Sequence, residues 1–202
     1  MEQVKAPLVA RKLKNRWFIA DTHFFHEDLL TFEKEDGHLC RSEFKNIEEH
    51  NQTIVDNWNG RVKPGDKVRH LGDVALGLKG SEYETKLHPL LNSLNGRKDL
   101  IIGNHDKVKN KILQNHFRTM ELWKRYSRDD WGVAFHLTHI PQRLDQLRKT
   151  NINIHGHIHE KLMDEPNYIS VCCEQTRLLC GAPYTPVHLD EIIAEIKKRG
   201  LA

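Results

Sequence analysis

The chain has 202 residues, of which 38% are hydrophobic and 29% are charged, a balance typical of water-soluble globular proteins. This length predicts one domain spanning residues 1–202. Because the sequence has no long apolar run and no apolar leader segment, we expect a cytoplasmic protein with no membrane span. The net charge of +3 neither requires nor excludes a nucleic-acid partner.

The first half of the chain alternates short apolar runs with helical patterns. The elements expected there are strands at residues 16–20 and 67–71 and helices at residues 46–59 and 81–95. Asn46 is a candidate N-cap for the first helix, and Ser81 with Glu84 has the spacing of a capping box. Pro89 should kink or split the second helix.

The second half of the chain continues the same alternation. Strands are expected at residues 99–102, 133–137, 151–154 and 168–173, and helices at residues 107–116, 142–149 and 189–199. The apolar runs are too short for independent helices and suit buried strands. Strands that alternate with helices predict an α/β fold with largely parallel pairing, whose ligands gather at the carboxyl ends of the strands.

Histidine and cysteine usage favours a metal site over a disulfide framework. The four cysteines lack paired CxxC spacing, so we expect buried thiols rather than disulfides. The chain has 14 histidines, and several of them follow the apolar runs directly. Composition therefore favours a metal centre with nitrogen and oxygen ligands.

Side chains able to bind a metal follow five of the expected strands. The segments read Asp21-Thr22-His23, Gly72-Asp73, Gly103-Asn104-His105-Asp106, Thr138-His139 and Gly156-His157-Ile158-His159. Each segment alone is weak evidence, because such residues are common in ordinary turns. The ordered set resembles the signature of the calcineurin-like metallophosphoesterases, D-x-H, G-D, G-N-H-D/E, H and G-H-x-H. The resemblance covers roughly residues 16–160 and points to the small stand-alone type found in bacteria and their phages.

The motif side chains offer more nitrogen and oxygen ligands than one tetrahedral zinc ion needs, and about as many as two metal ions of higher coordination need. The resemblance implies one ion held by Asp21, His23, Asp73 and His159, and a second held by Asp73, Asn104, His139 and His157. Asp73 would then bridge the two ions. We expect divalent metals, Mn²⁺ first, with Mg²⁺, Ni²⁺, Fe²⁺ or Zn²⁺ as alternatives.

Two further residues take catalytic roles by the same resemblance. His105 would face the scissile phosphate and protonate the leaving oxygen or stabilise its developing charge, and Asp106 would orient the His105 ring. His26 lies on the loop after His23, where small family members carry D-T-H-F-G-H and this chain has Phe25 in place of the glycine. We place His26 among the substrate-binding residues, with a purely local hydrogen bond as the alternative.

Other histidines have competing interpretations. His136 competes with His139 as the single-histidine ligand, and we prefer His139 because it follows the apolar run where the strand should end. His155 shares the two-residue period of the last motif, but the motif does not include it, so we expect it to support a ligand or to pack. We expect His70 to be structural.

The resemblance implies a four-layer αββα sandwich of two mixed sheets with flanking helices and a dimetal site at the carboxyl ends of the strands. It implies a hydrolase that cleaves phosphate mono- or diesters through direct attack of a dimetal-bound hydroxide, without a covalent intermediate. A small nucleotide or cyclic nucleotide is the first expected substrate. The segment 27–45 lacks strong periodicity, so we expect it to form a rim that supplies most of the selectivity.

Two alternatives remain open at the level of sequence. The first is a nuclease or an enzyme that processes nucleic-acid ends, for which Lys107, Lys109 and Lys111 would attract the polyanion. The second is a binding or scaffold protein that keeps the fold without catalysis. Such proteins commonly lose metal ligands or the catalytic histidine, and this chain keeps both. The metal, the substrate, the preference for monoesters or diesters and the oligomeric state are not determined by the sequence.

Overall fold

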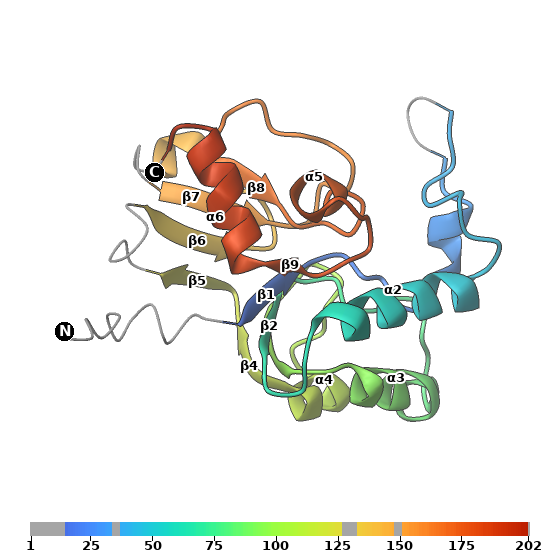
Figure 1. Ribbon diagram of the computed structural model, residues 1–202. Helices are drawn as coiled ribbons and strands as arrows, with labels where there is room; N and C mark the ends of the chain where they lie inside the picture. Colours follow the sequence, from blue (N-terminus) through green and yellow to red (C-terminus); the bar gives the residue numbers. More distant parts are fainter. Residues whose placement is uncertain (1–14, 34–36, 127–132, 148–150, 202) are drawn as a thin grey trace.

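The computed structural model describes residues 15–33, 37–126, 133–147 and 151–201. Its core consists of two β-sheets (Figure 1). In sheet order, the first contains β4 (Phe117–Glu121), β3 (Arg97–Ile101), β2 (Lys67–His70), β1 (Arg16–Ile19) and β9 (Val187–His188). The second contains β5 (Trp123–Tyr126), β6 (Ala134–Thr138), β7 (Asn151–His155) and β8 (Tyr168–Ser170). Each sheet is mixed, because β9 and β5 run antiparallel to their neighbours while the other pairs are parallel.

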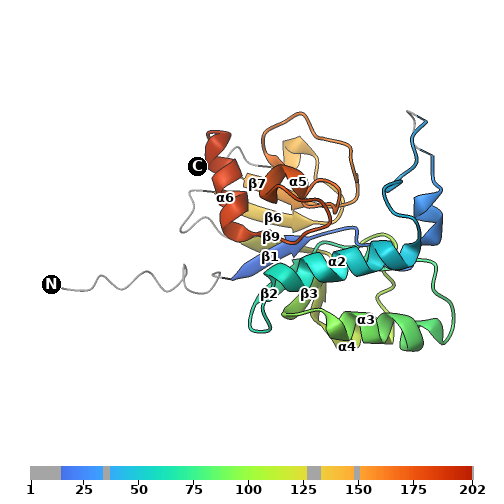
Figure 2. The ribbon, with the colours of Figure 1, turned by 45° about the vertical axis from the view of Figure 1, so that its right-hand side comes forward.

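Helices flank the two sheets. They are α2 (Ile47–Arg61), α3 (His88–Ser93), α4 (Lys111–His116), α5 (Arg177–Cys180) and α6 (Leu189–Lys198), with short turns η1 (Glu27–Leu30), η2 (Tyr83–Leu87) and η3 (Leu144–Gln146). The helices α2, α3 and α4 lie together on one side of the first sheet, and the second sheet lies on the other side with α5 and α6 (Figures 1 and 2). The expected α/β fold of two mixed sheets with flanking helices is therefore confirmed.

The apolar run of β1 is continuous because this strand packs on both of its faces. In β1, Ile19 packs toward the helices α2–α4, whereas Phe18 packs into the layer between the two sheets. Successive side chains of a strand point to opposite faces, so one strand supplies both layers of the core. Within the part of the chain that the structure describes, no helix is long and apolar enough to cross a membrane.

The helix expected over residues 81–95 begins differently from the prediction. The Asn46 side chain caps α2 as expected, by accepting a hydrogen bond from the backbone N–H of Glu49 at 2.8 Å. The predicted capping box at Ser81 is wrong: Glu82 is the N-cap residue, and no side chain caps this end. Pro89 does divide the segment, because it has no N–H to donate and lies in the first turn of α3, directly after the wide turn η2.

Other element boundaries also differ from the predictions. The helix expected over residues 107–116 starts only at Lys111, because the Asn110 side chain accepts hydrogen bonds from the N–H groups of Ile112 and Leu113. The helix expected over residues 142–149 reduces to the single turn η3, with residues 148–150 outside the described part. The strands β4, β5 and β9 were not predicted. Charged residues interrupt β4 and β5 and β9 is very short, so none shows an apolar run.

Candidate metal centre

All of the expected ligands lie on loops that directly follow strands. Asp21 follows β1, Asp73 follows β2, Asn104 follows β3 and His139 follows β6, and His157 and His159 follow β7. Because β1, β2 and β3 are parallel, as are β6 and β7, these loops meet at one edge of the sandwich.

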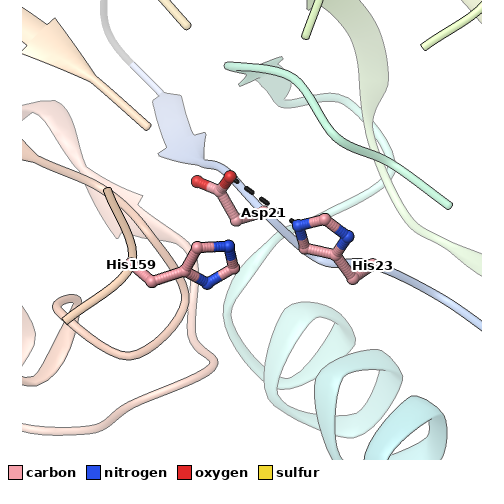
Figure 3. Close-up of side chains that lie close together, drawn as sticks. All are labelled: Asp21, His23 and His159. Atoms are coloured by element: carbon pink, nitrogen blue, oxygen red, sulfur yellow. Dashed lines mark ion pairs between the residues drawn. The ribbon is translucent and has the colours of Figure 1, made fainter. Parts of the chain in front are cut away.

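The loops bring the side chains into two clusters. Asp21, His23 and His159 form the first cluster, and Asp73, His139 and His157 form the second. Within each cluster the possible ligand atoms lie within 4.8 Å of one another. Figure 3 shows the first cluster, in which Asp21 Oδ1 lies 3.9 Å from His23 Nε2. The two clusters are those expected of a two-metal centre.

Asp73 lies between the two clusters. Its Oδ2 atom is 3.7 Å from His23 Nε2 and 3.3 Å from His139 Nε2. Its Oδ1 atom accepts a hydrogen bond of 2.9 Å from the backbone N–H of His105. Asn104 extends the second cluster, because its Oδ1 atom lies 2.9 Å from His139 Nε2. One carboxylate oxygen is therefore fixed by the backbone while the other faces histidines of both clusters.

The loops that carry the ligands have strained backbones. Positive φ angles occur at Asp21 (56°), His23 (45°), Asp73 (56°), His157 (74°) and His159 (50°). Such conformations cost a residue other than glycine about 1–3 kcal/mol and persist only where the surroundings hold them. Here the N–H of Asp21 donates to the carbonyl of Gly72, and the N–H of His23 donates to the carbonyl of Asp73. The strained φ angles and the backbone hydrogen bonds that hold them occur at the same candidate ligand residues, which is typical of functional sites.

Two glycines let the loops approach one another. Gly72 has φ +97°, and a Cβ there would lie 2.5 Å from His139 Nδ1. A Cβ at Gly103 would lie 2.2 Å from Asp73 Oδ1 and 2.4 Å from Asp73 N. At Gly103, which has no positive φ, the reason for a glycine is the close packing of its backbone against Asp73.

The hydrogen bonds of the Asp106 carboxylate go to backbone N–H groups rather than to the His105 ring. Its Oδ2 atom accepts hydrogen bonds of 2.9 Å from the backbone N–H groups of Asp73 and Gly103, and its Oδ1 atom accepts one of 3.0 Å from Val74. Burial raises the pKa of Asp106, and the backbone N–H groups oppose that shift. Asp106 therefore ties the loop after β2 to the loop after β3.

Hydrogen bonds to Nδ1 orient two of the clustered histidines. His139 donates its Nδ1–H to the carbonyl of Leu71 at 2.7 Å, and His159 donates its Nδ1–H to Glu174 Oε1 at 3.0 Å. Each bond leaves the Nε2 lone pair directed away from the supporting group, as in histidines that bind metals. Burial by itself would lower the pKa of His139, but its hydrogen bond to Asp73 raises it.

The environment of His23 indicates whether the first cluster suits a metal ion. It is only 3% exposed, and neither of its ring nitrogens has a hydrogen-bond partner among the described residues. Burial, followed by the nearby Arg41 charge, holds the pKa of His23 well below its usual range, so the ring is neutral. Burial also raises the pKa of Asp21 to about 6. A bound cation would satisfy the His23 lone pair and favour the ionised form of Asp21, so these residues fit a divalent metal.

The remaining histidines divide between the site and its surroundings. The His105 side chain is 41% exposed, and its Nε2 atom lies 3.9 Å from Asp73 Oδ2. The His26 ring lies beside the His23 ring, with 5.4 Å between centroids. His136 instead contacts Asn151 and belongs to neither cluster. His155 hydrogen-bonds the carbonyl of Gly156, which supports the loop that carries the last motif.

Sequence reasoning missed Arg41 and Glu174. Arg41 belongs to the expected rim at residues 27–45, yet it is only 2% exposed and donates to Glu174 Oε1 at 2.8 Å. The described residues of segment 27–45 include η1 and an isolated bridge between Glu33 and Leu39, and they lie beyond the N-terminal end of α2 (Figures 1 and 2). No local pattern marks an ion pair between residues 133 positions apart.

Two buried neutral histidines behind the site make stability depend on pH. His50 Nε2 accepts a hydrogen bond from Arg41, and His70 Nδ1 accepts one from the N–H of Gly72. Burial lowers the pKa of both to about 3, with the Arg41 charge adding to the effect at His50. The unfolded chain binds these protons near pH 6.5 and the folded chain does not, so stability falls as pH drops from about 6.5 toward 3.

We expect the metal-free wild type to lose stability more steeply than the variant His50→Gln/His70→Gln over this range. The difference in slope should approach about 2.7 kcal/mol per pH unit, the linkage expected for two protons. Urea unfolding in the presence of chelator at several pH values between 4.5 and 7 measures it. Parallel curves for the two proteins would show that these histidines are not neutral when buried.

The fold and the site define an α/β protein with a candidate two-metal centre at the carboxyl ends of its strands. The uncharacterised protein MJ1445 of Methanocaldococcus jannaschii is 33% identical to this chain over 187 residues, covering 92% of this chain and 93% of that protein. The chain belongs to the family of this archaeal protein. No family model matches the sequence.

Solved structures extend the comparison. The protein of unknown function AQ665 from Aquifex aeolicus matches with a TM-score of 0.65 and 24% identity, over 88% of this chain and 96% of that chain. This likeness supports the fold alone. An archaeal phosphodiesterase matches with a TM-score of 0.42 and 16% identity, over 83% of this chain and 88% of its own, which is too distant to support an argument about function.

Proposed function

We propose that this protein is a metal-dependent phosphoesterase of the calcineurin-like type, which hydrolyses phosphate mono- or diesters. The observation that carries the proposal is the position of Asp73. Its Oδ2 atom lies 3.7 Å from His23 Nε2 of the first cluster and 3.3 Å from His139 Nε2 of the second, which supports a bridging role for this carboxylate between two cations. Two ions held in this way suit an in-line displacement at phosphorus, where charge develops on both the attacking and the leaving oxygen.

Each cluster supplies the ligands of one ion in this proposal. The first cluster and Asp73 would hold one ion, and the second cluster with Asn104 would hold the other. When bound, the two ions polarise the phosphoryl oxygens and lower the pKa of water. Imidazole, carboxylate and amide ligands without thiolates suit Mn²⁺, Mg²⁺, Ni²⁺, Fe²⁺ or Zn²⁺, and we retain Mn²⁺ as the first expectation.

Residues outside the ligand set would act on the substrate. His105 is exposed at the edge of the clusters, so its ring can donate a proton to the leaving oxygen or stabilise its charge. His26 lies on the same side, beside His23, and would contact the substrate phosphate. Asp106 would hold the loops that carry Asp73 and His105. A small nucleotide or cyclic nucleotide remains the proposed substrate.

Removal of the metal should abolish activity and lower stability together. Emptying the clusters leaves buried carboxylates and an unpartnered His23, whereas binding at 100 times Kd stabilises a protein by about 2.7 kcal/mol. We expect EDTA to stop hydrolysis of a small chromogenic phosphodiester and to lower the Tm, and Mn²⁺ to restore both. Turnover and melting curves at matched ionic strength measure the two effects.

Full activity after elemental analysis has verified metal removal would contradict the two-metal proposal. Assaying cyclic nucleotides beside a single-stranded oligonucleotide separates the proposed substrate class from a nuclease. A preference for the oligonucleotide that weakens with added salt would favour the nuclease, because polyanion binding depends steeply on salt.

A further inference from the structure

A buried ion pair lies directly behind the first cluster. Arg41 and Glu174 are 2% and 7% exposed, and Arg41 Nε donates to Glu174 Oε1 at 2.8 Å. The same Glu174 oxygen accepts the Nδ1–H of His159 at 3.0 Å. Glu174 Oε2 has no hydrogen-bond partner within the described residues, so the contacts to Arg41 and His159 set the orientation of the carboxylate.

Arg41 also holds the backbone of the loop that carries Asp21 and His23. Its Nη2 donates to the carbonyl of Asp21 at 2.5 Å, and its Nη1 donates to the carbonyl of Thr22 at 3.2 Å. The guanidinium therefore connects two separate loops of the first cluster, one through the backbone and one through Glu174. Burying two charges costs several kcal/mol per ion. Packing alone therefore does not account for an ion pair at this position.

The two clusters differ in how their histidines are supported. His159 of the first cluster donates to an ionised carboxylate, whereas His139 of the second donates to the neutral carbonyl of Leu71. Burial by itself would raise the pKa of Glu174, but the Arg41 charge and the His159 hydrogen bond lower it below its usual range. A carboxylate behind an imidazole increases its basicity and fixes its orientation, which strengthens metal binding.

The two clusters are buried to a similar extent. Each has two buried members and one partly buried histidine, His159 in the first cluster and His157 in the second. Asn104, which extends the second cluster, is exposed, so water can reach that side chain. The main difference between the clusters therefore lies in the groups that support their histidines.

We propose that Glu174 and Arg41 are positioning residues that make the first cluster the tighter of the two metal sites. This inference rests on the proposed function, because it takes both clusters to bind metal. Glu174 orients His159, and Arg41 fixes Glu174 together with the loop of Asp21 and His23. Through Arg41, the segment 27–45 thus supports the first cluster as well as bordering it.

The test measures Mn²⁺ binding to the metal-free full-length protein by calorimetry, with bound metal counted by native mass spectrometry. We expect the wild type to show a tight and a weaker binding event. Glu174→Gln should weaken the tight event by about 10–100-fold, the usual effect of removing a group that supports a ligating histidine. Its matched control is Asp99→Asn, which breaks the buried ion pair with Arg69 in the first sheet and should leave both events unchanged.

A double-mutant cycle shows whether Glu174 acts through His159. In the His159→Ala background, Glu174→Gln should cause no further loss of affinity, because the supported ring is gone. If Glu174→Gln does not fold, Arg41→Met/Glu174→Leu removes both charges together, a replacement that is often neutral for stability. The double variant should also lose the tight event.

The outcomes separate this inference from the proposed function. A wild type that binds no metal contradicts the proposed function itself. A wild type that binds two ions, combined with unchanged affinity in Glu174→Gln or in the double variant, contradicts only the roles of Glu174 and Arg41. Additive losses in the His159→Ala background would likewise overturn the positioning role.

Discussion

Replacing Asp73 with asparagine is expected to abolish activity and metal-induced stabilisation together. Asp73 faces both clusters through Oδ2, so the substitution weakens two coordination spheres and removes the negative charge between two cations. Metal ions supply several kcal/mol of transition-state stabilisation, which corresponds to a loss of about 10³-fold or more in kcat/KM. Elemental analysis after gel filtration should find the variant depleted in metal.

The readout of this experiment is the change in Tm on adding Mn²⁺, because the variant also loses stability without metal. Asp73 supports the charged form of His139 and accepts the N–H of His105. Asp66→Asn is the matched control: Asp66 is a buried carboxylate that accepts a backbone N–H from Lys63, at the amino end of β2. The control should keep the Mn²⁺-induced rise in Tm, and the Asp73 variant should not. A normal rise in both proteins would show that Asp73 bridges nothing.

Replacing His105 with alanine should reduce kcat while leaving both metal ions in place. The side chain is 41% exposed, and the contact of this residue with Asp73 Oδ1 runs through its backbone N–H, which alanine keeps. General acid assistance is worth about 10²–10⁴-fold in rate, so we expect kcat to fall by that factor at nearly unchanged Tm. Kinetics, metal content and melting curves on one preparation measure all three properties.

The identity of the leaving group separates proton donation from other effects of the His105 substitution. A phenol with a low pKa needs little protonation, so the loss in kcat should shrink for a nitrophenyl ester and remain large for an alkyl or nucleoside ester. His116→Ala, which removes the half-buried histidine at the end of α4, is a control expected to leave both substrates unaffected. Equal losses on both substrates would assign His105 to binding or charge stabilisation instead. Metal loss from the His105 variant would make it a ligand.

The local sequence pattern was sufficient to predict the strands that position the candidate site, and most of the candidate ligands that follow them lie in the two clusters. A continuous apolar run is typical of a strand buried on both faces, and β1 comes closest to this pattern, whereas β2 and β3 carry charged residues beside their apolar ones. Metal ligands must follow such strands closely to meet at one edge of a sandwich. Each motif in the sequence therefore also marks the carboxyl end of a strand. The Asn46 cap is likewise local, because a cap and its partner are three residues apart.

The tertiary structure alone decided how distant segments combine. Charged residues interrupt the strands β4 and β5, so neither shows an apolar run and only their pairing with β3 and β6 identifies them. Asp106 contacts backbone N–H groups of the loop after β2 instead of the neighbouring His105 ring. Arg41 lies within an irregular segment, yet the docking of the two sheets brings it against Glu174. Periodicity and motifs predict contacts between residues that are close in the sequence. The strand pairings of β4 and β5 and the contacts of Asp106 and Arg41 depend instead on where the two sheets place their strands and loops.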